Sequence, residues 1–262
     1  MRVGPERMSE NGQRTDSRAE LAPQELPREV AELVGEVSEE APLSRRRRFS
    51  AQISRLARRS GRAGWQGARS SGRWLTAEVL AMAPRLPVRD QQRLRAQFPG
   101  LDPEELADAL IHGAARSAAV VGAAAGAAMV LPLPTAPVEI LVETMAVVGI
   151  EIKLVAELHE VYGMRAPGSA PERMLAYVGA WAERSGVALA PAGLILVAGS
   201  PLRRRLQRRL LARAGRSSVS LAPLLTGTMA AALLNRRETR RLGADVRDDL
   251  RRRSPYTMHW TR

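Results

Sequence analysis

The longest apolar pattern of the chain runs from Asp102 to Gly163 and predicts two consecutive helices. Asp102, Pro103 and two following glutamates are typical of a helix start, because Asp caps the first turn and proline needs no N–H donor there. We expect this helix to reach about Val130, and its second part, Ser117 to Leu133, carries no charge. After a Leu-Pro-Leu-Pro break, a return helix is expected over residues 137–163.

Small residues favour close packing of these two helices. Gly122 and Gly126 lie four positions apart among alanines, a spacing that lets another helix approach closely. We therefore predict a buried Gly/Ala-rich helical hairpin. The alternative is insertion of residues 117–133 into a bilayer, but 17 residues are at the lower limit for a span. The return helix would also bring charges into the lipid: Glu139, Glu143, Glu151, Lys153 and Glu157. Shallow or conditional insertion stays open.

Two further patterns predict basic amphipathic helices. In SRRRRFSAQISRLARRSGR, which begins at residue 44, Phe49, Ile53 and Leu56 form one apolar stripe, and Trp65 and Trp74 follow. In SPLRRRLQRRLLARAGR, which begins at residue 200, leucines recur at every fourth position from 202. Such helices either lie on an anionic membrane surface or dock on the protein's own core.

The rest of the chain also indicates helices. A polar loop after residue 163 leads to a short helix that stops near residue 186, and the apolar segment over residues 187–199 is too short to span a bilayer. The segment from residue 218 begins as a small-residue apolar helix and ends highly charged. Aromatic residues make up only 3% of the chain and no alternating run is present. The fold class is therefore all-α, a multi-helix bundle.

Charge divides the chain into segments. Residues 1–43 carry ten acidic residues and five arginines, which indicates a disordered acidic tail, with room for one short helix over residues 25–40. Residues 44–73 carry ten arginines and no acid, and residues 200–262 are also strongly basic. We expect a basic arm over residues 44–97, a helical domain over 98–253 and a tail over 254–262. The net charge is +13.

Candidate catalytic chemistry is sparse. Projection of the return helix places Glu139, Glu143, Lys153, Glu157 and Glu160 in one sector, which indicates a solvated face. Glu151 lies nearer the apolar side, as the edge of a polar face or the partner of an arginine, although a metal or acid-base site with His159 or Glu143 is an alternative. Cysteine is absent, and no phosphate loop, nucleophile elbow or zincin motif is present. We expect no cofactor, no metal and no catalytic residue.

Three motifs resemble the EcsC family of helical proteins. They are GAAAGAAMVLPLPTAPVE, the helix end ELHEVYG with Tyr162 and Gly163, and TGTMAAALLNRRETRRLGADV. The resemblance covers roughly residues 102–253, and Glu139 stands where the family pattern leads us to expect Asp. It implies association with membranes or transport machinery and no agreed biochemical activity. The positions that match the family pattern are Glu139, Glu151, Tyr162, Gly163, Asn235, Thr239, Arg240 and Gly243.

These observations favour a non-enzymatic scaffold that binds an anionic membrane, or an acidic or transport protein, from the cytoplasmic side. No apolar leader follows the first residues, which favours the cytoplasm. The proposed contacts are Arg45, Arg46, Arg47, Arg48, Phe49, Ile53, Trp65, Trp74, Arg203, Arg204, Arg205, Arg208 and Arg209. A nucleic-acid-binding protein is the first alternative, since the sequence pI is about 11.4, and a metal-dependent or hydrolytic enzyme is the second. The oligomeric state is left open.

Overall fold

The computed structural model describes residues 25–38, 52, 55–56, 73–128, 136–185 and 223–254. Within these ranges the chain is helical and contains no strand, which confirms the all-α class. The elements are α1 (Glu25–Ser38), α4 (Arg73–Met82), the 3-10 helix η1 (Ala83–Arg85), α5 (Gln91–Gln97), α6 (Pro103–Ala128), α7 (Ala136–Val161), α8 (Ala170–Arg184) and α10 (Pro223–Arg253).

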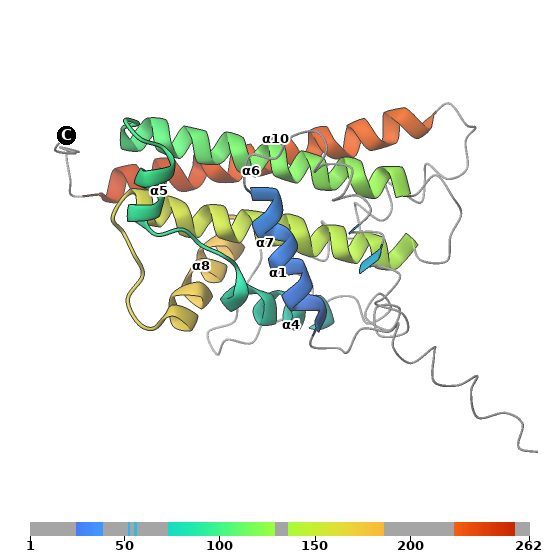
Figure 1. Cartoon of the computed structure of the whole chain (residues 1–262), viewed down its shortest axis with the longest axis horizontal. Coiled ribbons are helices and arrows are strands. Elements are labelled where there is room, and N and C mark those ends of the chain that lie inside the picture. Colours follow the sequence, from blue (N-terminus) through green and yellow to red (C-terminus); the bar gives the residue numbers. More distant parts are fainter. Residues whose placement is uncertain are drawn as a thin grey trace, which may run out of the picture.

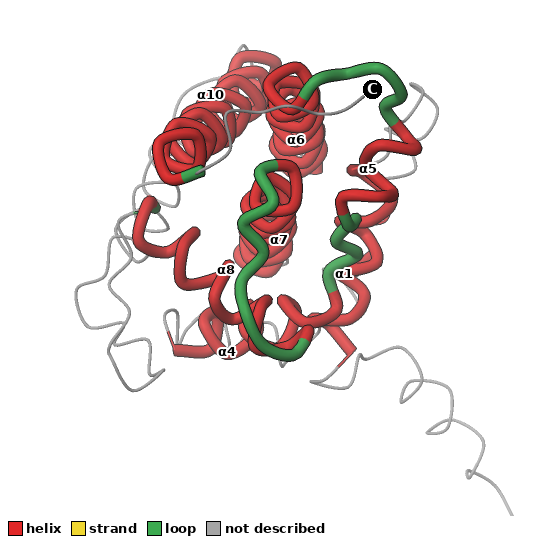
Figure 2. The backbone as a smooth tube through the Cα atoms, turned by 90° about the vertical axis from the view of Figure 1, so that its left-hand side faces the viewer, coloured by secondary structure: helices red, strands yellow, loops and turns green. Residues whose placement is uncertain are grey.

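Helix α7 lies at the centre of the bundle. Viewed along its axis, it is surrounded by α6 and α10 on one side, by α4 and α8 on the other, and by α1 and α5 (Figure 2). Every residue from 142 to 158 is buried. In side view, α6, α7 and α10 are the three long, roughly parallel rods of the fold (Figure 1). The predicted buried hairpin is thus confirmed, with α7 as its inner member.

Local sequence signals set the ends of the hairpin. The Asp102 side chain accepts a hydrogen bond from the Glu105 amide at 2.8 Å, and the Glu105 carboxylate accepts one from the Asp102 amide at 3.0 Å, which forms a capping box at the start of α6. At the other end, α7 stops at Gly163, whose φ of 65° favours glycine. The adjacent Tyr162 hydroxyl donates to Glu104 at 3.0 Å and ties the end of α7 to the start of α6.

Helix α10 runs antiparallel to α6 and packs against it more extensively than any other pair of elements. Its inward stripe follows helical spacing and consists of Asn235, Thr239, Leu242, Val246 and Leu250. Gly243 makes the close approach possible. A Cβ atom there would lie 2.8 Å from Ile111 Cγ1 of α6 and 3.1 Å from Leu154 Cδ2 of α7. The predicted late helix, apolar first and charged later, is confirmed.

Helix α1 corrects the expectation for the acidic tail. The short helix expected over residues 25–40 is confirmed as α1, and the expectation of disorder is wrong for residues 25–38. Leu26, Val30 and Val34 recur at every fourth position and are at most 5% exposed, so they join the main core. Gly149 of α7 leaves room for Val34, whose Cγ2 atom would lie 2.9 Å from an added Cβ. The acidic side chains that suggested disorder occupy the outer face.

Of residues 44–72, the first part of the expected basic arm, the structure describes three. Gln52, Arg55 and Leu56 are helical, Leu56 is 5% exposed and belongs to the core, and Gln52 donates to the Glu36 carboxylate of α1 at 3.0 Å. At Leu56 the predicted apolar stripe therefore docks on the protein itself. Residues 1–24, the apolar segment over 187–199 and the second basic helix lie outside the described residues.

Candidate functional site

The outer face of α10 combines exposed apolar and cationic side chains. Met229 and Leu233 are 64% and 59% exposed, the highest values among the large apolar side chains of the described residues. Exposed arginines follow within two turns. At about 100° per residue, Leu233, Arg237 and Arg240 lie roughly 100–160° around the helix from the buried Thr239, and Met229 and Arg236 roughly 60–80°. We call this surface the α10 outer face: Met229, Leu233, Arg236, Arg237 and Arg240.

All but one of the predicted membrane contacts lie outside the described residues. Arg45 to Arg48, Phe49, Ile53, Trp65 and the arginines from 203 to 209 lie outside the described residues. Trp74 belongs to helix α4. Sequence reasoning did not include Met229 or Leu233 among the contacts, although their spacing of four, just before an arginine cluster, is a signal that the sequence contains.

Buried polar residues form a column along α7. The Asn235 side-chain amide donates to Glu143 Oε1 at 3.3 Å and to the Ala118 carbonyl at 3.4 Å. Two turns further along α7, Glu151 accepts a hydrogen bond from Trp181 Nε1 at 2.9 Å and from Thr239 Oγ1 at 3.2 Å. All these side chains are at most 3% exposed. The polar column, Glu143, Glu151, Trp181, Asn235 and Thr239, therefore links α7 to α8 and α10.

The column explains several positions of the family-like motifs. Glu151 of α7 belongs to it together with Asn235 and Thr239 of α10, and Gly243 lies one turn beyond Thr239 at the close approach of α10. Arg240 is exposed on the α10 outer face. Glu139 belongs to helix α7. Glu151, Asn235, Thr239 and Gly243 thus have a structural role: they hold α10 against the hairpin.

The prediction of a solvated face on the return helix is wrong. Glu143, Lys153, Glu157 and Glu160 are between 2% and 8% exposed. Neighbouring helices cover this sector, and a projection of the α7 sequence cannot show that. Each of the four charged side chains forms a hydrogen bond or ion pair with a group of another segment or of a neighbouring turn. Glu151 is 2% exposed and accepts hydrogen bonds from Trp181 and Thr239, so it is not the edge of a solvated face. Its pairing with an arginine of the basic arms stays a prediction.

A substitution at Thr239 tests the polar column. Thr239→Val keeps the shape of the side chain but removes the hydroxyl that donates to Glu151, so we expect a loss of about 1–2 kcal/mol in the free energy of unfolding. A double-mutant cycle with Glu151→Gln, followed by urea denaturation, measures the coupling of the pair. Strictly additive effects of the two substitutions would show that the hydrogen bond contributes nothing to stability.

The second buried group joins α7 to the loop before α5. The Arg89 guanidinium donates from Nε and Nη2 to the two carboxylate oxygens of Glu157, at 2.8 and 2.7 Å. Lys153 also pairs with Glu157 and donates to the Pro87 carbonyl at 2.8 Å. Burial alone would raise the pKa of Glu157, but the hydrogen bond from Arg89 and the nearby positive charges outweigh it and lower the pKa. We call Arg89, Lys153 and Glu157 the charged cluster.

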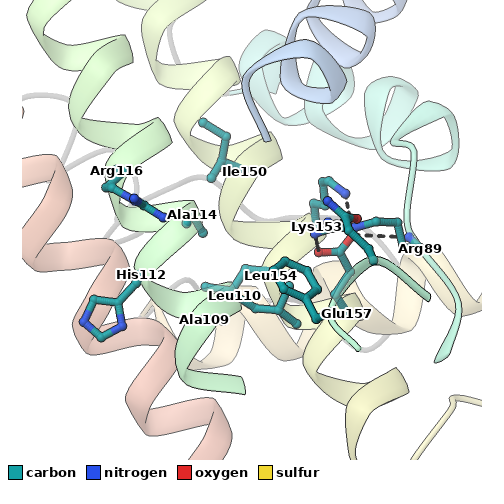
Figure 3. Close-up of a pocket in the computed structure, with 13 residues that line it drawn as sticks. Arg89, Ala109, Leu110, His112, Ala114, Arg116, Ile150, Lys153, Leu154 and Glu157 are labelled. Atoms are coloured by element: carbon teal, nitrogen blue, oxygen red, sulfur yellow. Dashed lines mark hydrogen bonds and ion pairs between the residues drawn. The ribbon is translucent and has the colours of Figure 1, made fainter. Parts of the chain in front are cut away.

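A small cavity adjoins the charged cluster. It has a volume of about 110 Å³ and lies between the loop around Arg89, α6 and α7. Arg89, Lys153 and Glu157 meet on one side of it, Leu110 and Leu154 lie beside them, and His112 and Arg116 lie on α6 across from them (Figure 3). The lining thus combines an apolar floor with three cationic side chains and one carboxylate.

The suggested acid-base or metal pair of Glu151 and His159 finds no support in the geometry. His159 Nδ1 lies 2.7 Å from the Val155 carbonyl and its ring packs against Tyr177, with ring centres 5.0 Å apart. Burial lowers the pKa of His159. In the described part of the chain, no cluster of three His, Asp or Glu side chains is arranged to hold a metal ion.

None of the described helices combines the length and the apolar character of a transmembrane span. Helix α6 covers most of the uncharged run, and residues 129–133 of that run lie outside the described ranges.

Comparison with known proteins gives no relative: no family model, no curated protein and no solved structure matches this chain. The resemblance to the EcsC family thus remains a proposal that depends on the motifs themselves.

Proposed function

We propose that this protein is a non-enzymatic helical scaffold that binds an anionic membrane surface. The observation that carries the proposal is the α10 outer face, where two exposed apolar side chains precede a cluster of exposed arginines. Basic residues beside apolar anchors on one helix face are typical of peripheral binding to anionic lipids, and this face carries three arginines. The mechanism is adsorption, in which the arginines contact lipid phosphates and Met229 and Leu233 enter the interface.

The Arg-rich segments extend this proposal. Each arginine near an anionic surface contributes on the order of 1 kcal/mol, and the segments over 45–48 and 203–209 add nine arginines. The net charge of +13 favours the same partner through long-range attraction. Membership of the EcsC family, whose name links it to a transporter operon, is part of the proposal and agrees with a location at the inner face of a membrane.

Replacing Leu233 tests the role of the α10 outer face. Leu233→Asp removes an apolar anchor and adds a negative charge, so binding to vesicles of phosphatidylcholine with phosphatidylserine should weaken about tenfold. Leu175→Asp is the matched control, because Leu175 is 50% exposed but lies on α8. Co-sedimentation measures both variants. Equal binding by the two variants would remove the α10 outer face from the mechanism.

A further inference from the structure

One end of the bundle consists almost entirely of uncharged residues. It comprises residues 118–128 of α6, 136–142 of α7 and 223–234 of α10, which together contain one charged residue, Glu139. Helix α6 runs toward this end, and α7 and α10 run away from it, so the three ranges lie together at the right-hand end of the rods in Figure 1. We call these three ranges the apolar end.

One set of contacts fixes where the apolar end begins on all three helices. The Asn235 side-chain amide of α10 donates to the Ala118 carbonyl of α6 at 3.4 Å and to the Glu143 carboxylate of α7 at 3.3 Å. Since α6 and α10 are antiparallel, the charges of α6 stop at Arg116 close to the level at which the charges of α10 begin at Arg236. The boundary therefore lies at one level of the bundle.

Four exposed arginines of α10 follow this boundary: Arg236, Arg237, Arg240 and Arg241. Within the described ranges, none of the four forms an ion pair with a carboxylate, and Glu238 is the one acidic residue among them. Arginines at the opposite end of α10 do pair with carboxylates: Arg247 with Asp108, Arg251 with Glu104, and Arg253 with Asp249. The excess positive charge of this helix therefore lies beside the apolar end. We call the four residues the arginine band.

The apolar end presents apolar side chains to its surroundings. Met229, Leu233 and Leu234 of α10 are 64%, 59% and 45% exposed, and Val120 and Ala123 of α6 are half-buried. Charged groups resist entry into a bilayer, whereas apolar side chains enter its interface readily. Arginines beside such a surface can reach the lipid phosphates. The order of apolar end and arginine band thus matches the order of acyl chains and phosphates in one leaflet.

We propose that the bundle contacts an anionic bilayer end-on, with the apolar end in the interface and the arginine band at the depth of the lipid phosphates. This inference rests on the proposed membrane binding, and it adds α6 as a second contact and a defined orientation of the bundle. Entry is shallow, about 5–10 Å, as is typical of interfacial helices. Glu139 belongs to the first turn of α7, where the helix dipole favours a negative charge.

Single cysteines can report the orientation, because the chain contains no cysteine of its own. Leu234→Cys and Asp248→Cys are a matched pair, since both residues are exposed and lie about 40° apart around α10 but about 21 Å apart along it. Ala123→Cys adds a position on α6. Each variant is labelled with nitrobenzoxadiazole and mixed with vesicles of phosphatidylcholine and phosphatidylserine that contain a spin-labelled lipid. We expect a blue shift and quenching of the labels at positions 234 and 123, and no change at position 248.

The same labels distinguish this proposal from membrane binding itself. Equal quenching at positions 234 and 248 would show that α10 lies flat on the membrane, and an unquenched label at position 123 would exclude α6 from the contact. Either result would overturn the end-on orientation while vesicle binding remains. Absence of vesicle binding by wild type would overturn both proposals.

A second measurement needs no label and tests the arginine band. Arg237→Gln combined with Arg241→Gln removes two charges beside the apolar end and should weaken binding to the same vesicles by about 30-fold. The control combines Arg252→Gln with Arg253→Gln at the opposite end of α10 and should change binding by less than about threefold, because that end stays in water beyond the reach of the lipid phosphates. Equal losses in the two double variants would also overturn the proposal.

Discussion

Glu157→Ala should lower the free energy of unfolding by about 3–5 kcal/mol, the largest effect we expect from a single side-chain truncation in this protein. Glu157 is 2% exposed and its carboxylate pairs with both Arg89 and Lys153. Truncation leaves two cations in a largely buried region without that carboxylate, and an uncompensated buried charge costs more than the pair itself contributes. Denaturation by urea with linear extrapolation measures the change.

An exposed ion pair provides the control for this prediction. Glu32 pairs with Arg28 on α1, where the two side chains are 61% and 72% exposed, so Glu32→Ala should cost less than about 0.5 kcal/mol. A loss below about 1 kcal/mol for Glu157→Ala would contradict the importance of the charged cluster.

Acid should weaken the same cluster in a defined range of pH. The pKa of Glu157 in the folded protein is below its ordinary value of 4.5, so the pair stabilises the fold above pH 4.5. This contribution is lost as pH falls from 4.5 through the folded pKa. The difference in stability between wild type and Glu157→Gln should therefore shrink below pH 4.5. A difference that is constant across this range would exclude the ion pair as its cause.

Gly243→Leu should destabilise the fold by about 3 kcal/mol, the upper end of the usual cost of overpacking a core. The first added atom already lies 2.8 Å from Ile111 Cγ1 and 3.1 Å from Leu154 Cδ2, and leucine adds three more. Helix α10 must then move away from α6 and α7, which also weakens the hydrogen bond between Thr239 and Glu151. Thermal and urea unfolding measure the loss.

Alanine at two glycines separates steric clash from helix propensity. Gly113 lies inside α6 with nothing within 4 Å of an added Cβ, so Gly113→Ala should stabilise by about 0.5–1 kcal/mol. Gly243→Ala gains the same propensity but meets the branched side chain of Ile111, and should be less stable than Gly113→Ala by about 1–2 kcal/mol. Equal effects of the two substitutions would mean that α10 does not approach the hairpin closely.

The helices themselves could be predicted from the sequence because their signals are local. The capping residues at Asp102, the Leu-Pro-Leu-Pro sequence and the stop at Gly163 are local signals, and α6 and α7 begin and end close to the expected positions. Residues 25–38 are rich in acidic residues, and that composition suggested disorder. The apolar stripe at every fourth residue, which packs α1 into the core, was given too little weight. Composition averages over a helix, whereas burial depends on one of its faces.

The buried polar groups could not be predicted because they depend on distant segments. Projection of the α7 sequence correctly placed Glu143, Lys153 and Glu157 in one sector of the helix. Whether that sector faces water depends on the packing of α1, α5 and α10 against α7, and the sequence of α7 alone does not give that packing. Arg89 illustrates the same limit. It is one arginine among 39, and only the fold places it against Glu157 and the cavity. The motif residues of α10 were recognised by resemblance, and their role in packing follows from the contacts.

The most direct test of the proposed binding to an anionic membrane is co-sedimentation of the full chain with neutral and with anionic vesicles. The sedimented vesicles are then washed in high salt and in alkaline carbonate. The proposed adsorption predicts binding to the anionic vesicles alone and release by salt, because attraction between arginines and lipid phosphates is screened. Equal binding to neutral vesicles, retention through salt, or absence of binding to either type would contradict it, and the last result would direct attention to acidic proteins and nucleic acids as partners.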